Sequence, residues 1–144
     1  MAYIEDVKPS GTIGGATTSG SYLTRDLNTI RGDLTFASLV SNEFTLIAGQ
    51  YILEASAPAF VATQHKIRLY NVTNLAVEQV GDLSYSHPIS PSLTRSTVKC
   101  TIDIAVDTTY RIEHQVTSAN ALGFGVPAGF GDDEIYTTVK VIKL

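Results

Sequence analysis

The sequence is poor in the residues from which catalytic and metal sites are usually built. Cys100 is the only cysteine, so no disulfide can form within the chain. The three histidines, His65, His87 and His114, have no metal-binding spacing such as HxH or HExxH. The chain also has no GxSxG turn, P-loop or GxGxxG motif. We therefore predict that the protein is not an enzyme and has no catalytic residues, metal or other cofactor.

Charge is scarce as well. Only 17% of the residues are charged, and the net charge is −4. No cluster of lysine and arginine could neutralise a phosphate backbone, so nucleic acid is not a predicted partner. This low charge argues against disorder, and 44% of the residues are hydrophobic. No apolar run approaches the roughly 18 residues of a membrane helix. Residues 1–11 lack the features of a signal peptide, so we expect a soluble protein made in a cytoplasm.

What the sequence does contain is alternation of apolar and polar residues. Residues 50–57, for example, place Tyr51, Leu53 and Ala55 on one face and Ile52 and Glu54 on the other. Pro58 is expected to end this strand or to put it at a sheet edge. No segment has a convincing helical period. The predicted strands are residues 34–40, 44–47, 50–57, 64–70, 75–80, 96–106, 109–117 and 135–144. This pattern predicts an all-β protein, an antiparallel β-sandwich or jelly roll of about 8–10 strands.

The first thirty residues differ from the rest. Residues 11–21 are rich in glycine, threonine and serine and cannot form a core of their own. We interpret residues 1–30 as an extended N-terminal arm or an irregular first strand, and residues 31–144 as the jelly-roll domain. Such an arm could pack on its own domain, on a neighbouring subunit or on a larger assembly.

A few side chains could carry chemistry. Cys100 lies in an apolar alternation and is interpreted as a small buried hydrophobic residue. His65 and His114 share strand faces with apolar residues, which favours hydrogen-bonded histidines in the core or an interface. Two such histidines could also meet at a symmetry axis. The acidic run at residues 132–134 is expected to be a solvated loop rather than a calcium site.

Other residues indicate contact between proteins. Phe124 and Phe130 lie in a glycine-rich loop, where they either fold back over the open end of the barrel or meet a partner; we favour a subunit contact. Several strands carry apolar residues on both faces, which suggests a protein–protein interface closed by cyclic symmetry. The predicted interface residues are Tyr3, Ile4, Tyr22, Tyr51, Tyr70, Phe124, Phe130 and Tyr136.

A family resemblance points the same way. Residues 44–60, FTLIAGQYILEASAPAF, resemble the F-x-L-x-A-G-x-Y-x-I-x-A strand pair of small phage and prophage virion proteins, which are similar to the complement and tumour-necrosis-factor (TNF) jelly roll. Residues 67–71, 123–125 and 134–139 resemble the same group, as do residues 7–11 with 24–28. The resemblance implies a TNF-like trimeric jelly roll that binds surfaces. Such domains are capsid decoration or cement proteins, or knobs of fibres.

From these observations we expect a homotrimeric phage virion protein that decorates, binds and stabilises the assembled capsid. Its partners would be copies of itself and the major capsid protein. The arm would lie across neighbouring capsid subunits. The alternative is a receptor-binding knob of a tail or head fibre, which would recognise a host-surface glycan or protein through residues 87–93 and 118–133. An enzyme acting on polysaccharide is the third possibility.

Overall fold

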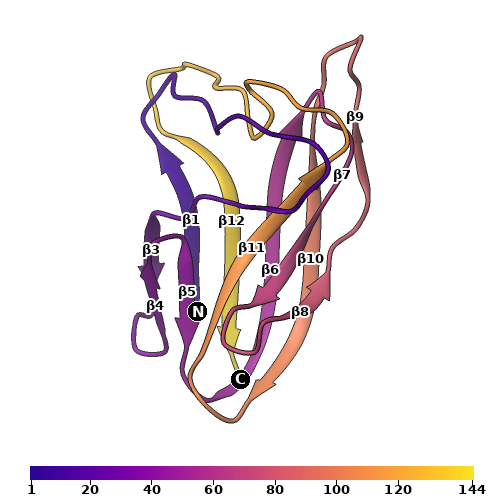
Figure 1. Cartoon of the computed structure of the whole chain (residues 1–144). Coiled ribbons are helices and arrows are strands. Elements are labelled where there is room, and N and C mark those ends of the chain that lie inside the picture. Colours follow the sequence, from indigo (N-terminus) through magenta and orange to yellow (C-terminus); the bar gives the residue numbers. More distant parts are fainter.

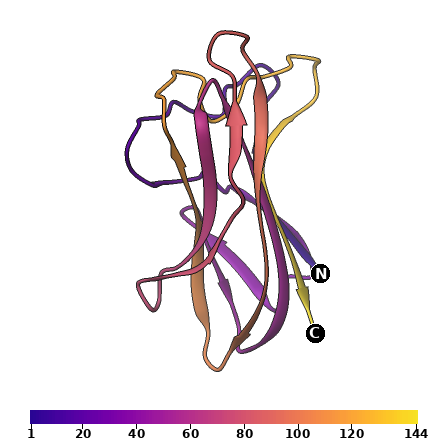
Figure 2. The same ribbon diagram turned by 90° about the vertical axis from the view of Figure 1, so that its right-hand side faces the viewer.

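The computed structural model describes all residues, 1–144, and consists of two antiparallel sheets stacked face to face (Figures 1 and 2). Sheet A contains β1 (Ala2–Lys8), β3 (Thr29–Gly32), β6 (Gly49–Phe60), β10 (Leu93–Ile104) and β12 (Glu134–Lys143). Sheet B contains β2 (Leu23–Thr24), β4 (Ala37–Val40), β5 (Glu43–Leu46), β7 (Thr63–Asn71), β8 (Ala76–Val80), β9 (Ser84–Ser86) and β11 (Thr108–Val116). The prediction of an all-β sandwich is confirmed.

The chain crosses repeatedly from one sheet to the other, and these crossings produce the strand order. Sheet A has the order β10-β6-β12-β1-β3, and sheet B has the order β4-β5-β11-β7-β8, with β2 added to β11 and β9 added to β7. From β5 to β7 and again from β9 to β12, each strand lies in the sheet opposite to the strand before it. Many neighbours in the sheets therefore come from distant parts of the chain, as β1 and β12 do, although β4 with β5 and β7 with β8 are consecutive.

The alternation in the sequence sorts side chains between core and surface as predicted. On β6, Tyr51, Leu53 and Ala55 are at most 1% exposed, whereas Glu54 points to solvent. One cluster of 19 buried hydrophobic residues joins both sheets, so the chain has a single main core. Each fully buried aliphatic side chain in it contributes about 1.5–3 kcal/mol relative to exposure.

Pro58 does not end β6, which continues to Phe60. Pro58 still pairs with Arg95 of β10, but the pairing of β6 with β12 stops at Ser56. On that open side the carbonyl of Pro58 accepts a hydrogen bond from Arg25 at 3.2 Å. β6 is therefore a sheet edge on one side at Pro58, which has no N–H to donate. Of the two predicted outcomes, the end of the strand or a sheet edge, the second is the one found.

The interpretation of residues 1–30 as an extended arm is wrong, and the alternative of a first strand holds in part. β1 lies inside sheet A, between β12 and β3, and Ile4 is completely buried. Arg25 and Leu27 are buried as well. Residues 9–22 have no regular structure but cross one end of the sandwich, where the N–H of Gly14 donates to the carbonyl of Gly125. Residues 9–22 are part of the domain, because their backbone groups form hydrogen bonds with other parts of the domain.

The long segment between β11 and β12 closes the same end. Phe124 folds back inside and is 7% exposed. Gly125 has φ 151° and lies against the ring of Tyr136, where a Cβ atom would collide with the ring. The Tyr136 hydroxyl in turn donates to the carbonyl of Thr12 at 2.6 Å. Packing of the loop, Tyr136 and residues 9–22 thus seals the end with few apolar side chains.

Candidate interaction surfaces

The outer face of sheet B carries a cluster of arginine and aromatic residues, which we call the outer arginine cluster: Tyr22, Arg68, Tyr70, Arg111 and Glu113. The guanidinium carbon of Arg68 lies 3.7 Å from the centre of the Tyr22 ring, and that of Arg111 lies 4.7 Å from the Tyr70 ring. Both arginines donate to Glu113, at 2.7 and 2.8 Å. Two cations share one carboxylate, so the cluster retains a net positive charge.

A pocket of about 430 Å³ lies beside this cluster, where residues 19–22 pass over the ends of β7 and β11. We call it the strap pocket. Its polar lining comes from Ser19, Tyr22, Gln64, Lys66, Gln115 and Thr117. Leu83 and Val116 supply its apolar surface. The volume falls within the roughly 300–1,000 Å³ range of small-molecule sites. Sequence reasoning missed this pocket because its walls are brought together only by the strap.

The two core histidines meet inside one subunit. His65 on β7 and His114 on β11 are 2% and 0% exposed, and the Nδ1 of His65 lies 2.9 Å from the Nε2 of His114. The Nε2 of His65 lies 2.8 Å from the hydroxyl of Thr94. The Nδ1 of His114 has no hydrogen-bond partner. The predicted hydrogen-bonded core histidine is confirmed, and the pairing needs no symmetry axis.

Burial favours the neutral form of both rings. Desolvation, reinforced by the positive charge of Arg25, lowers the pKa of His65 from 6.5 to about 4. The same two causes, in the same order, lower the pKa of His114 even further. One hydrogen bond between two ring nitrogens needs one donor and one acceptor, so the pair cannot accept a proton on both bridging nitrogens without losing that bond.

Arg25 completes this buried column without any carboxylate in contact. Its guanidinium stacks on the Phe124 ring at 4.0 Å, and Phe124 stacks on His114 at 5.5 Å between ring centres. Arg25 donates to the hydroxyl of Thr137 and to the carbonyls of Pro58 and Phe124. Desolvation lowers the pKa of Arg25 to about 9. The column, which we call the inner arginine column, ties the end loop to both sheets.

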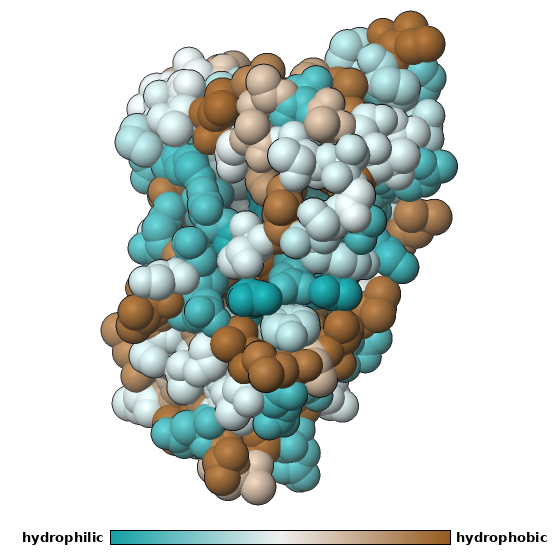
Figure 3. Space-filling model, viewed as in Figure 1, coloured by the Kyte–Doolittle hydropathy of each residue, from teal (hydrophilic) through white to brown (hydrophobic).

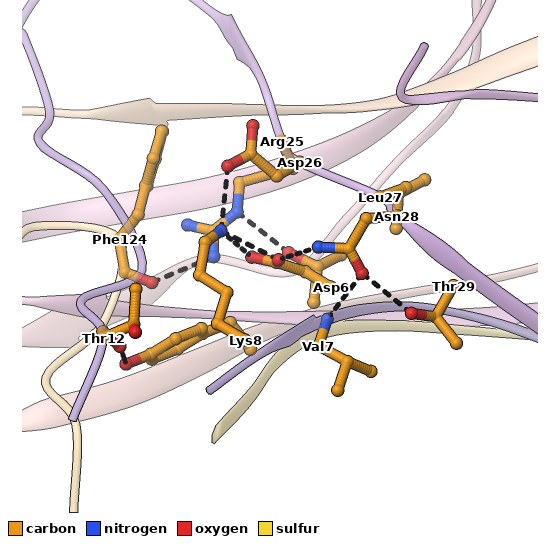
Figure 4. A network of polar contacts seen from close by, with 12 residues as sticks. Asp6, Val7, Lys8, Thr12, Arg25, Asp26, Leu27, Asn28, Thr29 and Phe124 are labelled. Carbon is orange, nitrogen blue, oxygen red and sulfur yellow. Dashed lines mark hydrogen bonds and ion pairs between the residues drawn. The ribbon is translucent and has the colours of Figure 1, made fainter. Parts of the chain in front are cut away.

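A polar network holds the chain just after Arg25 against β1 (Figure 4). The ammonium of Lys8 bridges the carboxylates of Asp6 and Asp26 at 2.8 and 2.9 Å. The side-chain amide of Asn28 donates to Asp6, and its oxygen accepts from the N–H of Val7. Burial, as the largest cause, raises the pKa of Asp6, although Lys8 opposes it. The network has the geometry of a structural clamp, since each polar group in it has a partner.

One margin of sheet B carries exposed apolar side chains that were not among the predicted interface residues. β8 pairs only with β7, and all five of its residues are exposed. Apolar side chains follow β8 and β9 along this margin and are visible at the right of Figure 3. We call them the apolar edge: Leu75, Val77, Val80, Leu83 and Tyr85. Residues 75–80 do not alternate strictly, so their period gave no signal for which side chains point outward.

The predicted interface residues divide into two groups. Ile4, Tyr51, Phe124 and Tyr136 are at most 7% exposed within their own subunit, so predicting them as exposed interface residues was wrong. Tyr3, Tyr22 and Tyr70 are half-buried on the outer faces of the sheets, and Phe130 is 85% exposed in the end loop. Ile4 and Tyr51 belong to the main core, and Phe124 and Tyr136 are buried at the closed end of the sandwich.

The remaining reactive groups have structural environments. Cys100 is half-buried against the core, and desolvation raises the pKa of its thiol to about 11. Glu134 accepts hydrogen bonds from the N–H groups of Gly11, Ala128 and Gly129, which lower its pKa. No group of three or more histidine, cysteine or acidic side chains is arranged to hold a metal ion. None of the elements is a helix that could span a membrane.

Comparison with known proteins does not add an assignment: no family model and no curated protein sequence matches the chain.

Proposed function

We propose that the protein is a non-enzymatic structural protein that associates with copies of itself through the apolar edge. The observation that carries this proposal is the edge strand β8, whose residues are all exposed and whose second backbone edge is unpaired. An edge strand of this kind is a template for another chain unless it is covered. Exposed apolar patches on a folded domain mark protein–protein contacts.

The neighbouring residues favour a second copy of the same chain as the occupant. Val77 and Val80 lie opposite Tyr70 and Arg68 in the ladder with β7, so the apolar edge continues into the outer arginine cluster. The cluster offers cations and rings together with a carboxylate, Glu113. Such a mixed surface is compatible with a closed ring of identical subunits, and we propose a homotrimer.

We further propose that the sandwich is a TNF-like jelly roll and that the trimer decorates a phage capsid, binding the major capsid protein and stabilising the assembled shell. The alternation of strands between the sheets from β5 to β7 and from β9 to β12 supports the jelly roll. Binding to assembled shell and not to free subunits would stabilise the shell by mass action, and three footprints on one trimer would reinforce one another.

The alternative role, a receptor-binding knob on a tail or head fibre, is compatible with one further observation. The connection between β9 and β10 projects beyond the sandwich (Figure 1), and Ile89 in it is 85% exposed. This loop is one of the two predicted to recognise a host-surface glycan or protein. A projecting loop with an apolar side chain is a suitable contact for either a capsid or a receptor.

Sedimentation equilibrium at micromolar concentration tests the self-association. We expect a mass three times that of the 15.4 kDa chain. The double variant Val77→Lys/Val80→Lys should be monomeric, because it places two cations on the contact. Val106→Lys changes a side chain that is 65% exposed between β10 and β11 and should leave the trimer intact. A monomeric wild-type protein would contradict the proposal.

Copy number in purified virions separates the two virion roles. A decoration protein should be present in hundreds of copies per particle, and a fibre knob in only a few. Quantitative mass spectrometry against the major capsid protein gives this ratio. Absence of the protein from virions would reject both roles and leave only the self-association to be explained.

A further inference from the structure

The strap pocket has the chemistry of a ligand site, and it adjoins the proposed subunit contact because Leu83 belongs to both. Lys66 lies in its wall and takes part in none of the five ion pairs of the chain. Two carboxylates close to the pocket, Glu113 and Asp82, have hydrogen-bond donors within the fold, although Asp82 keeps its charge. Glu113 accepts from Arg68 and Arg111, and Asp82 accepts from the N–H of Thr97 at 2.6 Å. No carboxylate lines the pocket, so Lys66 is available to an anion.

The pocket lies in a positively charged area of an acidic protein. Lys66, Arg68 and Arg111 carry three positive charges on the outer face of sheet B, and Glu113 offsets only one of them. The chain as a whole has a net charge of −4. A local excess of positive charge beside a concave surface attracts anions and raises their local concentration.

The other polar groups in the lining are hydrogen-bonding groups without a charge. Lys66 and Gln115 are direct partners across β7 and β11, so their side chains stand together on the outer face. The amide oxygen of Gln64 accepts from the hydroxyl of Thr117 at 3.2 Å, which leaves the amide NH₂ group to the pocket. Ser19 adds a hydroxyl. Amides and hydroxyls arranged in this way suit a ligand with several hydroxyl groups.

An aromatic wall is fixed in place on the same side. Arg68 stacks on the Tyr22 ring at 3.7 Å and is itself held by Glu113, so the ring position is defined before any ligand arrives. Leu83 contributes apolar surface. Sites of this type combine an apolar surface with a few placed polar groups. A sugar ring has this dual character, with apolar C–H faces and a polar perimeter.

We propose that the strap pocket binds an acidic sugar unit, in which the carboxylate meets Lys66 and the ring hydroxyls meet Gln64, Gln115 and Ser19. A carboxylate suits the site better than a phosphate. Arginine binds phosphate well because it can donate two parallel hydrogen bonds, but both nearby arginines, Arg68 and Arg111, already donate to Glu113. The ligand class is a uronate or a related carboxylated sugar. The pocket goes beyond the proposed assembly role and does not rest on it.

Titration of the isotope-labelled full-length protein with glucuronate, followed by NMR, tests the site. Saturable shifts are expected for residues 19–22, 64–66 and 115–117, including the side-chain amides of both glutamines. Glucose lacks the carboxylate, and acetate lacks the ring. Each should bind at least about tenfold more weakly, a difference of about 1.4 kcal/mol. Glucose 6-phosphate should also bind more weakly than glucuronate.

Matched variants locate the charge effect. Lys66→Gln should weaken glucuronate binding at least about tenfold and leave the weak binding of glucose unchanged. Lys140→Gln removes a lysine from the other sheet and should change neither. The proposal is overturned by absence of saturable shifts, by equal affinity for acetate, by tighter binding of glucose 6-phosphate, or by an unaffected Lys66→Gln variant. Both substitutions lie at partly exposed positions, so a retained amide spectrum confirms that the fold is intact.

Discussion

Sheet B has an arginine–aromatic group on each of its faces, and the two groups differ in how the cation is compensated. In the inner arginine column, Arg25 is 1% exposed and meets only neutral acceptors and the Phe124 ring. In the outer arginine cluster, Arg68 is about a quarter exposed and pairs with Glu113. The polar atoms of the inner group are therefore satisfied within the fold, whereas the outer cluster presents excess positive charge at the surface, where other molecules can contact it.

The largest effect should come from removing the inner cation. Arg25→Leu would leave the hydroxyl of Thr137 and the carbonyls of Pro58 and Phe124 without their donor. Each buried acceptor left unsatisfied costs about 1–3 kcal/mol, so we expect a total loss of about 4 kcal/mol. Urea unfolding of the variant measures it. Arg111→Leu, in the outer cluster, should cost less than about 1 kcal/mol; equal losses for both variants would remove the contrast between the two groups.

The next largest loss of stability is expected on acidification, through the two histidines packed beside the inner arginine column. His65 and His114 have folded pKa values lowered below 6.5 by burial, so the unfolded chain binds more protons as the pH falls. Stability is therefore complete above pH 6.5 and is lost below it. Two histidines together should cost about 3 kcal/mol between pH 7.5 and 5.5, a window above the ordinary pKa values of carboxylates.

Denaturant midpoints at a series of pH values check this slope. His65→Gln should reduce it to about half, since one titrating ring remains. His87→Gln is the matched control, because His87 lies in the exposed loop before β10 and should leave the slope unchanged. A flat profile in the wild-type protein would show that the histidine pair is hydrated or already broken in solution.

Neutralising the outer carboxylate should have a smaller effect. Glu113→Gln removes the shared partner of Arg68 and Arg111, and we expect a loss of about 1.5–3 kcal/mol because the Glu113 side chain is only 5% exposed. Glu54→Gln on the exposed face of sheet A should stay within about 0.5 kcal/mol. Thermal unfolding at pH 7.5 separates the two. Glu113→Gln should also bind anions more tightly at the strap pocket, because it removes a negative charge from the cluster beside the pocket.

The smallest effect on stability is expected at the aromatic wall. Tyr22→Ala removes the stack on Arg68, a contact worth about 0.5–1 kcal/mol at a partly exposed site. Hydrogen exchange should then increase in residues 19–24 and remain unchanged at β10. An unchanged exchange rate in residues 19–24 would mean that this segment is held by its backbone pairing alone, such as that of β2 with β11.

The sequence predicted the sheets better than the surfaces. Period-two alternation placed Tyr51, Leu53 and Ala55 of β6 in the core, and it placed His65 and His114 on inward faces. It could not place Arg25, because a single arginine in a segment of mixed polar residues has no period that indicates burial. The partners of Arg25 are 33 to 112 residues away in sequence.

The errors have the same physical origin. Tyr136 was predicted at an interface because it lies opposite Ile135 on its strand, but Tyr136 is covered by residues 9–22 and only Ile135 remains half exposed. Alternation states which residues share a face but not what covers that face. The strap pocket and the apolar edge depend on loop paths and strand order, and these follow from long-range pairing that local patterns do not encode.

The position of β1 also has a consequence for how the chain reaches this state. β1 hydrogen-bonds along one side to β12, so two strands far apart in the sequence must meet, as Ala2 with Val141 illustrates. The centre of sheet A cannot be completed on a growing chain until β12 has been made. Pairings at such long sequence separation slow folding. Until then β1 can pair only with β3, and its other backbone edge stays open to contact with other chains.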